Sequence, residues 1–312
     1  MIRRGDVEAA RERIRAHVRH TPVLEVGRGE LAGELVFKLE FLQHTGTFKA
    51  RGAFNRVLAA QASGQLDPRV GIVVASGGNA GLANAYVAAR LGVPAVVFVP
   101  ETAPAIKVAR LKAYGATVLP AGVEYATAYA AAQEHVTRTG AVYCHAYDQP
   151  EIAAGAGTLA LELLEQTSEP VDTVVVAVGG GGLMAGVTAA LEGLPTQVVA
   201  VEPETAPTLR AALDAGEPTD VAVSGIAADA LGARRIGDIG FDMARLAKVR
   251  SILVDEAEII AARALLWDRW RIIVEHGAAT AFAAVASGRH VAERDERLAV
   301  VLCGANTDPR DL

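Results

Sequence analysis

Short apolar runs rich in β-branched residues alternate along this chain with alanine-rich stretches that carry polar residues at helical spacing. This alternation is typical of consecutive βα units. The predicted strands are 35–38, 71–75, 95–99, 173–178, 197–201 and 298–302. The predicted helices are 80–91, 104–114, 124–139, 158–165, 183–191, 256–269 and 278–287. Because the strands are apolar on both faces, we expect them to be buried in largely parallel sheets.

Two weak breaks divide this pattern, one at 64–68 and one at 147–150. The segment between them contains its own series of strands and helices. We therefore predict a large discontinuous domain of residues 1–62 and 149–312. A smaller α/β domain of residues 63–148 would be inserted into it, with a cleft between the two.

Composition excludes several classes of partner. The chain has 312 residues, 51% of them hydrophobic, and a net charge of −6. No run of Lys or Arg suggests nucleic-acid binding. The apolar stretches are too short to span a membrane, and the start lacks an apolar signal core. The two cysteines, Cys144 and Cys303, lie far apart, so we expect no disulfide and a reducing, cytoplasmic location.

The segment TGTFK (45–49) shortly after the first predicted strand contains a candidate reactive lysine. Thr47 is suited to cap a helix, which would place Lys49 in the first turn. The helix dipole there disfavours an ammonium ion, so the amine would lose its proton more easily. A lysine that forms a Schiff base needs that tendency. A solvated surface lysine is the ordinary alternative.

The segment SGGNAG (76–81) connects a predicted strand to a predicted helix. Backbone N–H groups at such a helix start can receive a carboxylate, and the amide of Asn79 can donate to a phenolate oxygen. The glycines could equally serve only the turn of the backbone.

Four consecutive glycines, Gly179 to Gly182, stand between another predicted strand and helix. They would leave room for a ligand against bare backbone, and the helix start suits a phosphate. After the last predicted strand comes Cys303, whose thiol could bond a ring nitrogen without a formal charge. A lone buried cysteine is the simpler alternative.

The glycine loop also fits a dinucleotide-binding fingerprint. Gly180-x-Gly182-x-x-Ala185 matches the relaxed pattern, and Glu202 ends the next strand where a ribose-binding acid would lie. An NAD-dependent dehydrogenase is therefore an alternative, although it gives the polar residues of the other loops no shared role. A non-catalytic amino-acid-binding protein is a third, but it has no use for an imine-forming lysine.

Taken together, the loops resemble the serine/threonine dehydratase and serine racemase group of pyridoxal-phosphate enzymes. FKLEFLQHTGTFKARGA (37–53) looks like the lysine motif of that group, and SGGNAG (76–81) like its S-x-G-N loop. AGAGT (154–158) resembles its A-G-Q-G-T segment, and GGGGL (179–183) its phosphate loop. The resemblance runs nearly from end to end.

The resemblance implies fold type II, as in the tryptophan synthase β chain: two open, largely parallel α/β domains with the cofactor in the cleft between them. Lys49 would carry pyridoxal phosphate and, together with Ser76, would be catalytic. The other implied cofactor-binding residues are Phe48 against the ring, Asn79 at the phenolic oxygen, Gly179, Gly180, Gly181, Gly182 and Leu183 at the phosphate, and Cys303 at the ring nitrogen. The implied substrate-binding residues are Ser76, Gly77, Gly78, Asn79, Tyr147 and Glu275.

The implied activity is a dehydratase (ammonia-lyase) reaction. A β-hydroxy amino acid, first of all L-threonine or L-serine, would lose water and ammonia to give a 2-oxo acid, with Lys49 taking the α-proton. Serine racemisation and dehydration of a bulkier substrate are the alternatives. The resemblance also implies a homodimer, and potassium or another monovalent cation is a further candidate cofactor. The chain leaves no room for the regulatory domain of biosynthetic threonine dehydratases, so feedback inhibition is not expected.

Several positions depart from the group's pattern and leave the substrate open. Ala80 stands where many relatives have His, Ala156 where they have Gln, and His276 where they have Pro. Glu202 matches the first ligand of the racemases' divalent-cation site, but Thr208 replaces a second carboxylate. We therefore expect no strong activation by magnesium or calcium.

Overall fold

The computed structural model describes residues 1–28, 33–123 and 125–311. Its larger sheet has the strand order β1-β2-β10-β7-β8-β9. These strands are β1 (Val23–Arg28), β2 (Glu34–Lys38), β7 (Thr173–Ala177), β8 (Gln197–Pro203), β9 (Arg250–Val254) and β10 (Arg297–Val301). All neighbours pair in parallel except β1 and β2. Only residues 29–33 separate those two, and so short a connection can join only antiparallel strands.

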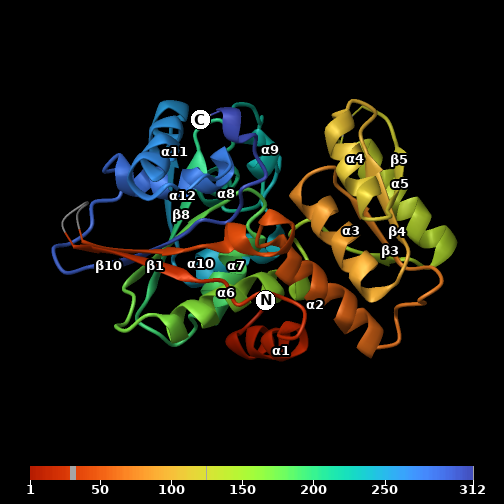
Figure 1. Cartoon of the computed structure of the whole chain (residues 1–312), viewed down its shortest axis with the longest axis horizontal. Helices are drawn as coiled ribbons and strands as arrows, with labels where there is room; N and C mark the ends of the chain where they lie inside the picture. The colour runs from red at the N-terminus through yellow and green to blue at the C-terminus, as the bar shows by residue number, and fades with distance from the viewer. Residues whose placement is uncertain (29–32, 124, 312) are drawn as a thin grey trace.

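A second sheet of four parallel strands has the order β5-β4-β3-β6. Its strands are β3 (Ile72–Ala75), β4 (Ala95–Val99), β5 (Thr117–Pro120) and β6 (Val142–Tyr143). Figure 1 shows this sheet and its helices as a separate group on the right. All four strands lie inside the segment 63–148, whose limits as an inserted domain remain a prediction.

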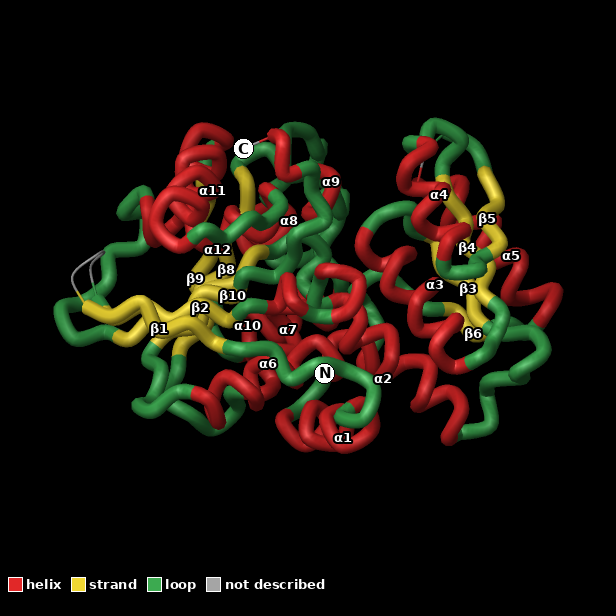
Figure 2. The backbone as a smooth tube through the Cα atoms, viewed as in Figure 1, coloured by secondary structure: helices red, strands yellow, loops and turns green. Residues whose placement is uncertain are grey.

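Helices flank both sheets, as Figure 2 shows in red beside the yellow strands. They are α1 (Arg4–Ile14), α2 (Lys49–Ala62), α3 (Asn79–Leu91), α4 (Ala105–Ala113), α5 (Tyr125–Thr139), α6 (Pro150–Gln166), α7 (Gly182–Ala190), α8 (Thr208–Ala215), α9 (Ala228–Leu231), α10 (Asp238–Leu246), α11 (Glu256–Trp270) and α12 (His276–Ala286). The predicted helix 124–139 begins at Glu124, which lies outside the described residues. In the part of the chain that is described, no helix has the length and apolarity needed to cross a bilayer.

Alternate residues of β3 face two different clusters. Ile72 and Val74 pack with Phe54 and Val57 of α2, whereas Val73 packs with alanines of α5. This is the alternation expected of a strand covered on both faces. Because α2 contributes to the core of the smaller sheet, it lies where the two sheets meet.

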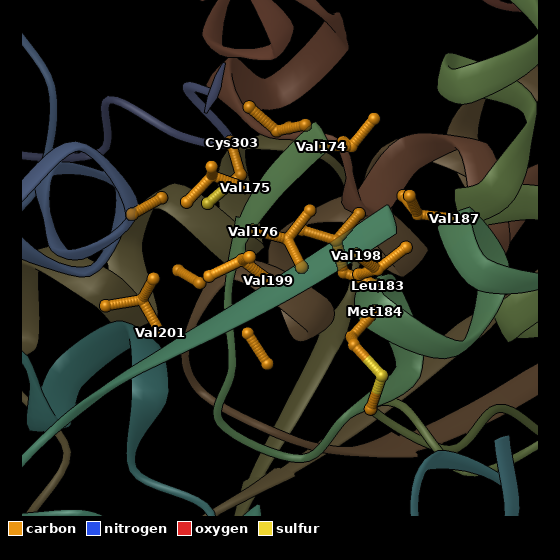
Figure 3. Packing of buried hydrophobic residues seen from close by; sticks show 14 of the residues in the cluster. Val174, Val175, Val176, Leu183, Met184, Val187, Val198, Val199, Val201 and Cys303 are labelled. Carbon is orange, nitrogen blue, oxygen red and sulfur yellow. The ribbon is translucent and has the colours of Figure 1, made fainter. Parts of the chain in front are cut away.

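The core of the larger sheet is built from the valines of β7 and β8 and the start of α7. Figure 3 shows Val174, Val198, Leu183 and Met184 in this core, together with Cys303. The segment AGAGT explains how α6 fits in closely between α2 and α7. A Cβ on Gly155 would lie 2.7 Å from the Arg51 carbonyl oxygen, and one on Gly157 would lie 2.3 Å from that of Gly186. Larger residues would push these helices apart.

A buried network of charges holds α2 in place. The guanidinium of Arg51, fully buried, donates to Glu40 at 2.8 Å and to Glu162 at 2.7 Å. Lys38 donates to Glu162 at 2.8 Å as well. Burial by itself would raise the pKa of Glu162, but Arg51 and Lys38 together lower it, so the carboxylate stays charged. The network fixes the first turn of α2, which begins at Lys49.

Candidate active site

The loops that the sequence singles out meet between the two sheets. The loop before α2 is joined to the loop after β10 by two contacts. The Phe48 N–H donates to the Cys303 carbonyl at 3.0 Å, and Thr47 pairs with Gly304 in an isolated bridge. The loop after β3 reaches the same place from the smaller sheet, because Asn79 donates to Glu275 at 2.8 Å.

Lys49 occupies a setting that favours a neutral amine. Its Nζ donates to the Ala146 carbonyl at 2.8 Å and lies 4.9 Å from the centre of the Phe48 ring. Although part of the side chain is accessible, burial of the amine lowers the pKa of Lys49 to about 8, and the nearby Glu275 carboxylate offsets this only in part. About a tenth of the amine is then unprotonated at pH 7.

The helix cap differs by one residue from the prediction. Phe48, not Thr47, stands at the N-cap of α2, and its own backbone is already helical (φ −55°, ψ −19°). The Thr47 hydroxyl accepts only a long contact, 3.4 Å, from the Lys49 N–H. Lys49 is nevertheless the first residue of the helix, so the dipole acts against its ammonium form as expected.

The loop from Ser76 to Asn79 presents unpaired donors at the start of α3. The Ser76 hydroxyl accepts from the Gly78 N–H at 3.3 Å. Among the described residues, no partner is recorded for the N–H groups of Gly77, Asn79 and Ala80. Free N–H groups at the positive end of a helix attract a carboxylate, which suits the predicted role of this loop.

The glycine loop before α7 is also rich in unpaired donors. Gly181 has φ +86°, a conformation that glycine adopts without strain. Within the described part of the chain, the N–H groups from Gly180 to Leu183 have no recorded protein partner, although Leu183 and two of the three glycines are buried. Buried backbone N–H groups without hydrogen-bond partners are rare in native proteins. Their presence at a helix start fits the phosphate of the cofactor that the resemblance implies.

Tyr147 lies against this glycine loop. A Cβ on Gly180 would fall 2.2 Å from the Tyr147 ring, so on that side the expected open space is filled by protein. The Tyr147 hydroxyl donates to the Arg235 carbonyl at 3.1 Å, and the ring packs edge-on against His145, with centroids 4.6 Å apart. Tyr147 thus lies beside the glycine loop, and its role in binding the substrate stays a prediction.

Burial acts on the ionisable groups of both Cys303 and Glu275. Burial raises the pKa of the Cys303 thiol far above its ordinary value, so the thiol is neutral at every physiological pH. Burial also raises the pKa of the Glu275 carboxyl, which accepts hydrogen bonds from Asn79 and from the Asn306 N–H at 2.8 and 3.2 Å. The neutral thiol is the partner that the sequence predicted for a ring nitrogen.

Sequence reasoning missed two polar residues of the site. Asn306 donates to the Asn79 side-chain oxygen at 2.8 Å, and its place in the loop after β10 was the available signal. His145 accepts from the N–H groups of Tyr147 and Asp148 through Nδ1, and burial lowers its pKa, so the ring is neutral. Its position directly before the carbonyl that binds Lys49 could not be inferred from spacing.

Glu202 has a structural role that removes the nucleotide alternative. Its carboxylate accepts from the N–H groups of Leu209 at 2.6 Å and Arg210 at 2.9 Å, and from the Thr208 hydroxyl at 3.1 Å. It is fully buried, and burial raises its pKa to about 7. A ribose therefore cannot reach it. The same contacts occupy the oxygens that a divalent ion would need.

The candidate active site does not lie at the larger of two cavities, and it is identified by its polar residues instead. A cavity of about 750 Å³ beside the N-terminus contains none of the predicted site residues. A cavity of about 30 Å³ lies over the Ser76 loop, lined by Asn79, Asn306 and the ion pair of Lys107 with Asp229.

Comparisons with known proteins agree with this arrangement. The family model described as pyridoxal-phosphate dependent enzyme matches residues 14–304. The chain is 37% identical over 307 residues to a phenylserine dehydratase of Ralstonia pickettii, covering 97% of this chain and 92% of the relative. It is 33% identical over 312 residues to an L-threonine ammonia-lyase of Thermotoga maritima, covering 99% of this chain and 76% of the relative.

A solved structure of maize serine racemase matches with a TM-score of 0.90 at 29% identity, covering 99% of this chain and 95% of the racemase. Three features of the site agree with this group of relatives. They are the lysine at a helix start, the glycine loop with free N–H donors and the neutral cysteine. The chain therefore belongs to the pyridoxal-phosphate-dependent enzymes, and within them to the fold type II group of serine/threonine dehydratases and serine racemases.

Proposed function

We propose that this dehydratase acts on L-threonine or L-serine and releases the corresponding 2-oxo acid and ammonia. The observation that carries the proposal is the setting of the Lys49 amine. Its amine lies between the loops of both sheets with a pKa lowered by burial to about 8. A general base works best when its pKa lies near the working pH, so Lys49 is suited to take the α-proton.

The remaining residues would bind and orient. The free N–H groups at Gly77 and Asn79 support binding of the substrate carboxylate beside Ser76. Fixing the carboxylate there would hold the α-proton in one position relative to Nζ of Lys49, which is the entropic part of catalysis.

The same site has the groups needed to hold pyridoxal phosphate. Lys49 would carry it covalently, with Phe48 against the ring, and the donors of Gly180, Gly181, Gly182 and Leu183 would bind its phosphate. Asn79 would donate to the phenolic oxygen, and the neutral Cys303 would face the ring nitrogen. When bound, the cofactor supplies a ring that accepts the negative charge left at Cα.

A β-aryl substrate is the second candidate. It is favoured by the 37% identity to a protein named phenylserine dehydratase. The edge-on pair of Tyr147 and His145 beside the glycine loop offers aromatic surface that could pack against an aryl group.

Further parts of the proposal concern setting and assembly. Both cysteines are free and buried, which supports a reducing, cytoplasmic location. The homodimer rests on the family resemblance, and the division into domains at 62/63 and 148/149 rests on the two breaks in the sequence pattern. Activation by potassium is a further candidate property. Light scattering of the purified protein, and activity measured in potassium against sodium buffers, would test assembly and cation.

The decisive assay measures 2-oxo acid release from L-threonine, L-serine, β-phenylserine and 3-hydroxyaspartate under the same conditions. We expect the highest kcat/KM with threonine or serine. The Lys49→Ala variant should lose turnover and the visible absorbance of the bound cofactor. Covalent cofactor that borohydride still traps in this variant would assign the attachment to another lysine.

A further inference from the structure

The side-chain amides of Asn306 and Asn79 are hydrogen-bonded to each other in the cleft between the two sheets. A backbone carbonyl fixes which way the Asn306 amide is turned. The Asn306 Nδ2 donates to the Thr45 carbonyl at 2.9 Å. A backbone carbonyl can only accept, so the Asn306 side chain has its NH₂ group on that side. Thr45 itself has φ +63°, a conformation rarely adopted by non-glycine residues. Its carbonyl is thus held in place at some cost in backbone strain.

The orientation of Asn306 determines that of Asn79. The same Nδ2 of Asn306 lies 2.8 Å from the Asn79 Oδ1, and this contact requires an oxygen on the Asn79 side. The Asn79 NH₂ group therefore points the other way, where its Nδ2 lies 2.8 Å from the Glu275 Oε1. A side-chain amide has two N–H donors. One is used by Glu275, and one remains.

Glu275 can hold this arrangement only as a double acceptor. Its Oε1 accepts from Asn79 and its Oε2 from the Asn306 backbone N–H. The residue is 8% exposed. Its place requires Gly304, where a Cβ would lie 2.5 Å from Oε1. A glutamine here would put an NH₂ group against one of the two donors.

We propose that Glu275 is a positioning residue: it holds the Asn79 side chain so that one N–H is left for the phenolic oxygen of the cofactor. This inference rests on the proposed role of Asn79 and extends it. Because Asn79 begins α3 and Glu275 stands at the N-cap of α12, the donor is oriented from the opposite side of the cleft. The donor is therefore in place only when the two sides are together.

A rival explanation is that Glu275 acts by its charge. The charge of the Glu275 carboxylate raises the pKa of Lys49, whereas burial lowers it. Removing the charge could then alter cofactor binding without involving Asn79. A double-mutant cycle separates the two explanations, because residues that act through one another give non-additive effects.

The cycle compares wild type, Glu275→Gln, Asn79→Ala and the double variant by the dissociation constant of pyridoxal phosphate and the visible spectrum of the bound cofactor. We expect Glu275→Gln to weaken binding about tenfold or more and to shift the spectrum. In the Asn79→Ala background the same change should have almost no further effect. An undiminished effect there would show that Glu275 acts directly, and an unchanged spectrum in the single variant would also overturn the proposal.

A reciprocal exchange separates positioning from simple stabilisation. In the variant Asn79→Asp with Glu275→Gln, the glutamine NH₂ can donate to the new carboxylate, so each contact is satisfied and the net charge is unchanged. Its urea midpoint should return to that of wild type, while cofactor affinity should not, because no donor remains. Recovery of affinity would refute the proposal.

Glu296→Gln, which changes a carboxylate bonded to Thr173 away from the cleft, is the matched control. Its cofactor affinity and spectrum should equal those of wild type, and a matching loss would mean that the readouts report general instability, against the proposal. If Glu275→Gln does not fold, Asn306→Ser tests the other support of Asn79 with the same readouts. If wild type formed no 2-oxo acid, the proposed function would be refuted. That outcome differs from those that would refute the role of Glu275, so the two failures are distinguishable.

Discussion

Replacing Gly157 by alanine should separate two helices that support the glycine loop. Gly157 in α6 faces Gly186 in α7, and an added Cβ would lie 2.3 Å from the Gly186 carbonyl oxygen and 3.0 Å from its Cα. Ordinary contact begins near 3.4 Å, so the backbones must move apart by about 1 Å. No flexible side chain stands between them to absorb the change.

The expected cost can be bounded from packing. Overfilling a close contact costs about 1–3 kcal/mol, and a clash between two backbones belongs at the upper end, near 3 kcal/mol. That is a large part of a typical stability of about 5–15 kcal/mol. Because α7 begins at Gly182, the shift also moves the free donors of the loop, so the affinity for pyridoxal phosphate should fall as well.

Urea unfolding followed by far-UV circular dichroism, together with cofactor titration, measures both effects. Gly5→Ala is the control, since Gly5 is also helical but an added Cβ would meet nothing within 4 Å. That change should be neutral or stabilising by about 0.5–1 kcal/mol. If Gly157→Ala unfolded at the same urea concentration as wild type, the close contact between α6 and α7 would be wrong.

Four other outcomes are expected. Covalent attachment of pyridoxal phosphate to the apoenzyme should speed up as pH rises, with a midpoint near the Lys49 pKa of about 8; a midpoint near the ordinary 10.5 would contradict this. Glu202 has a pKa raised by burial from 4.5 to about 7, so its contribution to stability is full below pH 4.5 and is lost as pH rises through 7. The urea midpoint of Glu202→Gln should therefore fall less over that range than that of wild type. A chelator should leave activity intact, and a large loss restored by magnesium or calcium would refute the assignment of Glu202 to α8. Racemisation should be marginal, because the racemases that the chain resembles carry, at the position of Gly77, a serine that serves the face opposite the lysine, and glycine has no such proton donor. Gly77→Ser should increase racemisation, since an added Cβ meets only Val99 at 3.4 Å. D-product formed by wild type as fast as the 2-oxo acid would refute this.

The six strands predicted from the sequence are found because their signals are local. Predicted strand 95–99 coincides with β4, and the other five match within one or two residues at either end. Strands β1, β5, β6 and β9 were not predicted. Helix α6 was predicted only from 158, whereas it begins at Pro150. Its first half contains Pro150, Gly155 and Gly157, which have low helix propensity. Close packing against α2 and α7 overrides that propensity, and packing cannot be inferred from neighbours in sequence.

The same distinction holds for the site. Lys49, the Ser76 loop, the glycine loop and Cys303 could be found from the sequence because each combines a strand or helix end with unusual residues over a few positions. Their chemistry follows from residue type and helix dipole, which are local properties.

Which of these residues face one another depends on the packing of the whole chain. Asn79 and Glu275 are 196 positions apart, and Asn79 and Asn306 are 227 apart, yet they share hydrogen bonds across the cleft. The contact of the Tyr147 ring with Gly180 was not predicted either. The path of the chain between distant segments is set by burial of both sheets at once, and side-chain direction at their meeting point depends on that whole arrangement. Residue type therefore determined what each loop can do, and packing determined with which partner it does so.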